Sequence, residues 1–197
     1  MADILKSIIQ VATRWKDMGA GSDGVTTWAP VVATTPAGSG RLSSVSITRP
    51  ANTTPYTAGD VIGNGAGGAA ALEFTSVGAS GGMIMIIGAD LECDIAAVPA
   101  GMGNMRLHLY SVTPPSALAD NAAFDIPSGD RASYLTQIDL GTPVDQGSTL
   151  YVPAITPMAV PVQLAGTSLF AYLMTAGGFT PAANSEVYKV RIRTLAL

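Results

Sequence analysis

Three carboxylates on one extended stretch are the first groups in this sequence that could do chemistry. The stretch from Met83 to Ile95 reads MIMIIGADLECDI, and Asp90, Glu92 and Asp94 recur in it at every second residue. Side chains of a strand alternate between its faces, so this spacing predicts one strand with an acidic face and a dry face. Clustered carboxylate oxygens are ligands for Ca²⁺. Carboxylates two residues apart on a strand nevertheless stand about 7 Å apart, too far to share one ion unless loops fold in.

A basic face of the same period lies near the end of the chain. Lys189, Arg191 and Arg193 alternate there with Val190 and Ile192. Opposite charges of matching period favour pairing across strands, either within one chain or between subunits. The acidic face therefore has three hypotheses: a solvated or internally paired surface, a charge match between subunits, and a metal site.

The remaining reactive side chains offer little to catalysis. Cys93 is the single cysteine and His108 the single histidine, so neither an internal disulfide nor a two-cysteine metal site is possible. Cys93 falls on the dry face, which is typical of a buried, inert thiol. The glycine-rich residues 63–68 lack the lysine and hydroxyl residue of a phosphate-binding loop. We expect a protein that is not an enzyme, with no catalytic residue, no cofactor and no bound metal.

The composition is typical of a subunit that neighbours cover. Only 12% of the 197 residues are charged and 48% are hydrophobic, with 22 glycines and 13 prolines. Sparse charge favours assembly over a free monomer. The net charge is −4 and the basic residues are scattered, so we expect no nucleic-acid partner. The sequence has no run of about 18 apolar residues and no signal-peptide pattern, so we expect no membrane partner and synthesis in a cytoplasm.

The elements that position these residues are mostly short strands. Residues 25–34 predict a first strand or an extended arm. Alternating patterns bounded by turn residues predict further strands at residues 41–49, 60–63, 72–76, 83–95, 105–110, 134–140, 149–155, 160–164, 168–175 and 186–195. Such spacing indicates an all-β fold, an antiparallel β-sandwich for which a jelly roll is the expected arrangement. We predict that residues 25–197 form this single domain.

The N-terminal segment has a different period. Apolar residues recur there at alternating spacings of four and three, which predicts a short α-helix over residues 3–18. The members of this stripe are Ile4, Ile8, Val11, Trp15 and Met18. Glycines in residues 19–24 predict a flexible tether, so residues 1–24 form a unit apart from the sandwich. A helix this short does not hold alone in water, so it must pack on its own domain, on sister subunits or on a partner.

Three segments, taken together, carry a family resemblance. They are SITRPANTTPYTAGDVIG at residues 46–63, ADNAAFDIPSGDRASYLTQIDLG at residues 119–141, and LAGTSLFAYLMTAGGFTPAANSEVYKVRIRTLAL at residues 164–197. Together they resemble structural proteins of tailed bacteriophages, among them capsid decoration (cement) and head-associated proteins. The likeness covers roughly residues 41–197 and leaves the predicted helix outside. The family offers no catalytic residues to carry over.

The resemblance implies a virion protein on the capsid surface, made in the host cytoplasm. We expect a cement protein that binds the major capsid protein and itself, as a trimer, with residues 1–34 as the clamp. The alternative is a head-fibre or tail-associated protein that binds a host-surface glycan or receptor, and a depolymerase is a third hypothesis. The candidate interface residues are Ile4, Ile8, Val11, Trp15, Met18, Trp28, Asp90, Glu92, Asp94, Lys189, Arg191 and Arg193.

Overall fold

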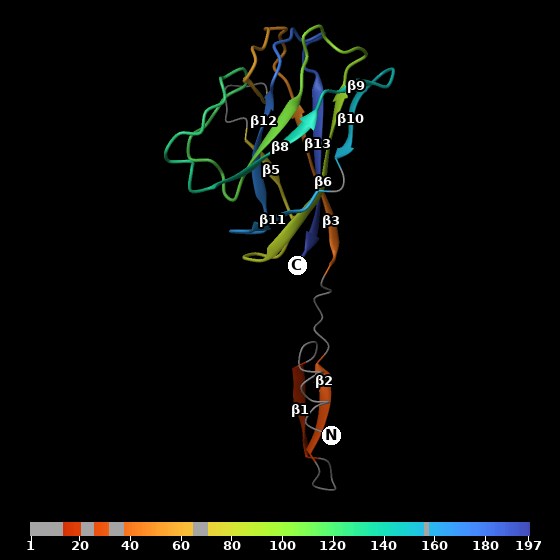
Figure 1. Cartoon of the computed structure of the whole chain (residues 1–197), viewed down its shortest axis with the longest axis vertical. Coiled ribbons are helices and arrows are strands. Elements are labelled where there is room, and N and C mark those ends of the chain that lie inside the picture. Colours follow the sequence, from red (N-terminus) through yellow and green to blue (C-terminus); the bar gives the residue numbers. More distant parts are fainter. Residues whose placement is uncertain (1–13, 21–25, 32–37, 65–70, 156–157) are drawn as a thin grey trace. The chain divides into compact units, whose positions relative to one another are not determined.

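The chain is divided into two compact units, Met1–Ala37 and Gly38–Leu197. The computed structural model describes residues 14–20, 26–31, 38–64, 71–155 and 158–197 (Figure 1). The boundary predicted between residues 24 and 25 falls outside these residues and stays a prediction.

The first unit contains an antiparallel hairpin. Strand β1 (Arg14–Ala20) pairs with β2 (Thr26–Val31), with Asp17 opposite Trp28. The helix predicted over residues 3–18 is therefore wrong over residues 14–18, and its other residues lie outside the described ones. A helix this short gains little stability alone, whereas pairing with a strand that contains Thr, Trp and Val satisfies the backbone groups of both segments. The strand predicted within residues 25–34 is confirmed as β2.

The second unit is built from strands β3 to β13 (Figure 1). Their bounds are β3 (Gly40–Thr48), β4 (Val61–Ile62), β5 (Leu72–Phe74), β6 (Met83–Asp94), β7 (Met105–Tyr110), β8 (Tyr134–Gly141), β9 (Val144–Asp145), β10 (Leu150–Ile155), β11 (Val160–Gln163), β12 (Leu169–Thr175) and β13 (Val187–Ala196). Every strand predicted from residue 41 onward is present. The residue pattern does not predict β9, because two residues are too few to show a period. No helix in the described part of the chain is long and apolar enough to cross a membrane.

The strand pairing follows the jelly-roll order. β3 pairs with β13, β4 and β5 with β12, β6 with β10 and β11, and β7 with β8, all antiparallel. The chain is thus one long hairpin, which the additional pairs β13–β6 and β12–β7 roll into two sheets. One sheet has the order β3-β13-β6-β10-β9, with β11 also on β6; the other has the order β4-β12-β7-β8, with β5 also on β12. The predicted jelly-roll-like sandwich is confirmed.

Alternating side chains of both sheets fill the space between them. On β6, Ala89, Leu91 and Cys93 are fully buried, as the period of two predicts. They belong to one apolar cluster with Leu107 and Leu109 of β7 in the other sheet. This core fixes which faces of β6 and β13 point outward, and so it positions the charged side chains.

The outer face of the second sheet is covered by a smaller aromatic layer. Leu118 and Phe124, from the connection between β7 and β8, pack on Tyr110 and Tyr172. The His108 ring, from the same strand as Tyr110, stacks on Phe124 with 3.8 Å between ring centroids. The outer face of this sheet is therefore dry around Tyr110 and Tyr172, and the single histidine lies within this layer.

Candidate functional site

The acidic face of β6 and the basic face of β13 meet within one chain. Asp90 lies opposite Arg191, and Glu92 lies opposite Lys189. Arg191 Nη1 donates to Asp90 Oδ1 at 2.9 Å, and Arg191 Nη2 donates to Glu92. Arg193 Nη1 lies 2.6 Å from Asp90 Oδ2. The choice between pairing within and between chains, which the sequence leaves open, is therefore settled for these four residues as pairing within the chain.

Asp90 is the centre of this cluster. Its side chain has no exposed surface, whereas Arg191 and Arg193 keep 21% and 35% of theirs in contact with water. Hydrogen bonds to Asp90 and then to Glu92 raise the pKa of Arg191 above its ordinary value. A buried carboxylate is stable only with its charge compensated, so the two guanidinium groups hold β6 and β13 together through it.

The other members of the two charged faces are not part of this cluster. Among the described residues, Asp94 and Lys189 form no ion pair. No group of three or more His, Cys, Asp or Glu side chains in the described ranges is arranged to hold a metal ion. A role of the charged candidates in contacts between subunits stays a prediction.

The apolar interface candidates lie in the first unit. Trp15 and Met18 are on β1, and Trp28 is on β2. Ile4, Ile8 and Val11 lie outside the described residues. Their role in an interface also stays a prediction.

The single histidine and the single cysteine are held in unreactive surroundings. Burial, and then the charge of Arg106, lower the pKa of His108 to about 4, so its ring is neutral at pH 7. Burial raises the pKa of the Cys93 thiol above its ordinary value, and the carboxylate of Glu186 adds to this. Because the thiolate is the reactive form, this thiol is inert near neutral pH.

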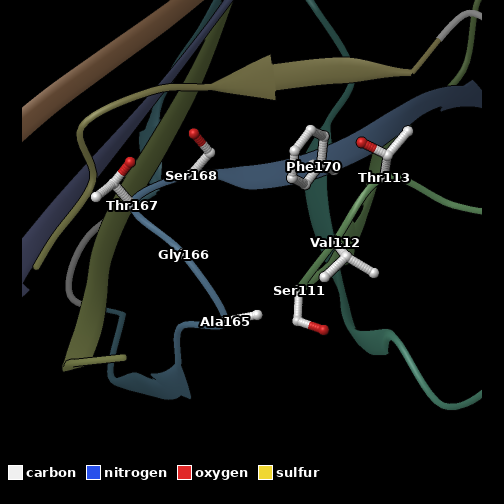
Figure 2. Close-up of a pocket in the computed structure, with 8 residues that line it drawn as sticks. All are labelled: Ser111, Val112, Thr113, Ala165, Gly166, Thr167, Ser168 and Phe170. Carbon is white, nitrogen blue, oxygen red and sulfur yellow. The ribbon is translucent and has the colours of Figure 1, made fainter. Parts of the chain in front are cut away.

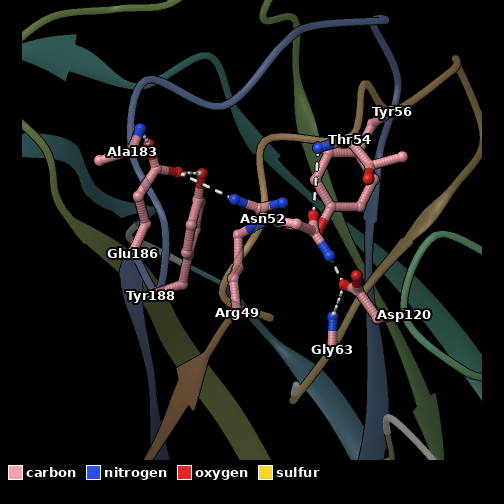
Figure 3. A network of polar contacts seen from close by, with 9 residues as sticks. All are labelled: Arg49, Asn52, Thr54, Tyr56, Gly63, Asp120, Ala183, Glu186 and Tyr188. Atoms are coloured by element: carbon pink, nitrogen blue, oxygen red, sulfur yellow. Dashed lines mark hydrogen bonds and ion pairs between the residues drawn. The ribbon is translucent and has the colours of Figure 1, made fainter. Parts of the chain in front are cut away.

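A second polar network, which the sequence patterns do not reveal, begins at the end of β3 (Figure 3). Arg49 directly follows that strand, and its side chain is fully buried. Its Nη1 lies 3.5 Å from Glu186 Oε2, and its Nε donates to the Tyr56 hydroxyl at 2.7 Å. The Tyr56 hydroxyl donates to Asp120 Oδ1 at 2.6 Å, and the same oxygen accepts the Gly63 N–H at 2.8 Å.

This network ties several connections to one buried cation. Glu186 also accepts the Tyr188 hydroxyl at 3.1 Å and the Ala183 N–H at 2.9 Å. The Arg49 guanidinium carbon lies 4.8 Å from the centroid of the Tyr56 ring, a cation–π contact. Burial is the main cause that raises the pKa of Tyr56 above its ordinary value, so its hydroxyl remains a donor. The only sequence signal is an arginine directly before a proline at a strand end, because its partners are remote along the chain.

Two open surface hollows lie among the described residues of the second unit. The larger, of about 340 Å³, carries no charged side chain and is lined by Ser111, Val112, Thr113, Ala165, Gly166, Thr167, Ser168 and Phe170 (Figure 2). The smaller, of about 280 Å³, lies beside the Arg49 network and is lined by Pro50, Asn52, Thr54, Asn64, Ala119, Asp120 and Asn121. Of these two hollows, the smaller includes an ionisable group, the carboxylate of Asp120.

Comparisons with solved structures return chains of viral particles. No protein-family model matches the chain, and no curated protein matches its sequence. A similar chain occurs in a heated full particle of Israeli acute paralysis virus, with 12% identity, a TM-score of 0.31, and coverage of 93% of this chain and 92% of that one. Another occurs in the capsid asymmetric unit of cyanophage Pam1, with 14% identity, a TM-score of 0.33, and coverage of 91% and 99%. A third, from the capsid of Helicobacter pylori bacteriophage KHP30, has 12% identity, a TM-score of 0.23, and coverage of 79% and 86%.

Proposed function

We propose that this protein is a non-enzymatic structural component of a bacteriophage virion, a decoration (cement) protein that binds the outer surface of the major capsid protein shell and stabilises the head. The observation that carries the proposal is a contrast on the second unit between paired charged side chains and exposed apolar ones. The most buried charges compensate one another within the chain, while large apolar side chains remain exposed where the chain enters the jelly roll. The resemblance of residues 46–63, 119–141 and 164–197 to phage structural proteins supports the same conclusion.

Four apolar side chains at this end, of which Leu195 is half-buried, make up what we call the entry patch: Leu42, Met83, Leu195 and Leu197. Leu42, Met83 and Leu197 are 63%, 41% and 58% exposed. The Leu197 N–H donates to Met83 O at 3.0 Å, which places these two residues side by side. The N–H of Gly38, the first residue of this unit, donates to Ala196 O of β13 at 3.0 Å, so this unit begins beside the patch.

We assign the entry patch to the capsid shell, because Leu42, Met83 and Leu197 are large apolar side chains that the second unit leaves exposed. Residues 1–34 remain the proposed clamp on the shell or on sister subunits of a trimer. Burying apolar surface contributes about 25 cal/mol per Å². Copies repeated around a symmetric shell act together, so modest contacts by each copy suffice to raise the free energy needed to separate shell subunits.

Cosedimentation of the purified full chain with empty, expanded shells of the parent phage tests the proposal. We expect saturation at an icosahedral multiple of copies, bound as trimers. No binding, or only a handful of copies for each shell, contradicts decoration and assigns the protein to the tail or to a vertex fibre.

Two altered chains locate the binding surface in the same assay. Leu42→Glu places a charge on the entry patch, and we expect binding at least about tenfold weaker, because an exposed leucine buried on the shell contributes about 1.5–3 kcal/mol. The matched control is Val144→Glu on β9, where a 49% exposed valine lies outside the patch. A chain without residues 1–24 loses β1, the partner strand of β2, while its second unit should remain folded. We expect it to lose shell binding; full binding by it contradicts the clamp.

A further inference from the structure

The hollow beside Asp120 lies at the opposite end of the jelly roll from the entry patch. Strand β3 begins beside the patch at Gly40 and ends at Thr48, directly before Arg49 and Pro50. At about 3.3 Å for each residue, this strand separates the two ends of the sandwich by nearly its whole length. The hollow is therefore free for a ligand of its own while the entry patch is covered.

The hollow is assembled by three connections that are distant in sequence. Pro50, Asn52 and Thr54 come from the connection between β3 and β4, and Asn64 follows β4. Asp120 and its two neighbours come from the connection between β7 and β8. Its volume of about 280 Å³ is close to the lower end of pockets for small molecules, which begin at about 300 Å³.

The chemistry of the lining selects the class of ligand. Its polar side chains are three amides, one hydroxyl and one carboxylate, and its apolar members are Pro50 and Ala119. No arginine, lysine or histidine is among the described residues that line it, so an anion finds no compensating charge there. A single carboxylate without a second one is a poor cage for a divalent cation. A neutral hydroxyl group both donates and accepts, which matches a carboxylate beside an amide.

The Asp120 carboxylate in the hollow is held in place by hydrogen bonds to one of its oxygens. Asp120 Oδ1 accepts two hydrogen bonds, from the Tyr56 hydroxyl and from the Gly63 N–H. The Tyr56 hydroxyl is in turn fixed by Arg49, whose buried guanidinium is compensated by Glu186 (Figure 3). Asp120 Oδ2 accepts no hydrogen bond from the described residues. One oxygen thus anchors the side chain, and the other remains as an acceptor at a fixed position.

The amides beside it are anchored in the same manner. Asn52 Oδ1 accepts the Thr54 N–H at 3.1 Å, and Asn64 Oδ1 accepts the Thr48 N–H at 3.0 Å. Because each amide is held through its oxygen, its NH₂ group is left as a donor. Acceptors and donors that are already oriented lower the entropy cost of binding.

We propose that this hollow, built on Asp120, Asn52 and Asn64, is a binding site for a neutral sugar residue, such as the terminal unit of a surface glycan. The carboxylate accepts hydrogen bonds from sugar hydroxyls, and the amides donate to the same hydroxyls. Pro50 and Ala119 contact the C–H surface of the ring. This activity is separate from shell binding, and it holds whether or not the protein decorates a capsid.

The test is a titration of the isotopically labelled full chain with glucose, galactose, mannose and N-acetylglucosamine, followed by amide chemical shifts. We expect at least one sugar to shift the Gly63 backbone amide and the Asn52 side-chain amide, with millimolar affinity. Asp120→Asn keeps the shape of the side chain and should weaken binding at least about tenfold, because it removes a charged acceptor.

A pair of matched variants separates the hollow from the rest of the surface. Ala119→Phe fills the hollow and should abolish the shifts, whereas Ala117→Phe, at an exposed residue outside its lining, should leave them unchanged. The proposal is overturned if no sugar of the panel shifts these amides, or if the shifts survive in both Asp120→Asn and Ala119→Phe. Calcium chloride alone producing the same shifts overturns it as well, because the ligand is then a cation.

Discussion

Two charged networks in the same unit are built in opposite ways. The Asp90 cluster joins two neighbouring strands, and its arginines remain 21% and 35% exposed. The Arg49 network joins a strand end to the connections around Tyr56 and Asp120, and both Arg49 and Glu186 are almost completely buried. The first network, which we call the ladder, places partly exposed arginines around the buried Asp90 on two paired strands. The second joins unlike groups from several connections around a fully buried arginine.

The difference shows what each network contributes. In the Asp90 cluster, losing Glu92 leaves Arg191 paired with Asp90. Losing Asp90 leaves Arg193 without an ion-pair partner among the described residues, but this guanidinium is 35% exposed and water solvates it. The buried network has no repetition. Glu186 compensates the charge of Arg49, and neither terminal nitrogen of Arg49 has a hydrogen-bond partner among the described residues, so the guanidinium depends on this one carboxylate. Burying these groups costs desolvation free energy. In return, the Arg49 network fixes the positions of the connections that form the hollow at the far end of the sandwich. Removing one member of the Arg49 network should therefore cost most of the stability that the whole network contributes. Removing one member of the ladder should cost only the contribution of that member.

Glu186→Gln should give the largest loss of stability. It leaves the buried Arg49 guanidinium without a counter-charge, which costs about 3–5 kcal/mol. Urea unfolding of the full chain followed by far-ultraviolet circular dichroism measures the change. The double variant Arg49→Met with Glu186→Gln should recover part of the loss, because no uncompensated charge remains. A loss under about 1 kcal/mol for the single variant would mean that water reaches the Arg49–Glu186 pair. The two networks would then not differ in the way proposed.

Acid should destabilise the protein through the buried ring of His108. Its folded pKa of about 4 lies below its ordinary value of 6.5, so the unfolded chain binds the proton first. Stability from the neutral ring is therefore complete above pH 6.5 and is lost as the pH falls towards 4, by up to about 3 kcal/mol. Urea midpoints between pH 7 and pH 4 measure this loss. His108→Gln should flatten this part of the profile; an unchanged profile assigns the loss to other groups.

The sequence predicts the ladder better than the buried network, for a physical reason. A period of two is imposed by the strand itself, so the charged faces of residues 90–94 and 189–193 are visible in the order of the residues alone. Arg49, Tyr56, Asp120 and Glu186 meet only because the hairpin is rolled, and no local pattern encodes that contact. The full burial of Asp90 is also not predictable from its strand, since two arginines from one neighbouring strand cover it.

The N-terminal segment shows the opposite failure, in which a local pattern is overruled. Apolar spacing that suits a helix over residues 3–18 is compatible with a strand at its end, because both structures place some apolar residues on one face. Pairing between β1 and β2 decides the outcome for residues 14–18. The spacing of apolar residues therefore predicts the secondary structure of this chain well where a neighbouring strand has a matching pattern. It predicts poorly where the sequence does not show which segment pairs with it.

Asp90→Asn and Glu92→Gln give the smallest effects and the finest comparison, because both remove one charge from the same ladder. Asp90 is fully buried and is shared by Arg191 and Arg193, so its replacement should cost about 2 kcal/mol. The Glu92 side chain is 38% exposed, and its replacement should cost under about 1 kcal/mol, less again at high salt. Urea unfolding at low and high salt measures both. Equal losses that salt removes in both variants would show that Asp90 behaves as a surface charge. The burial of Asp90 would then add nothing to the stability that the ladder contributes. Only the Arg49 network would have ion pairs that are strengthened by exclusion of water.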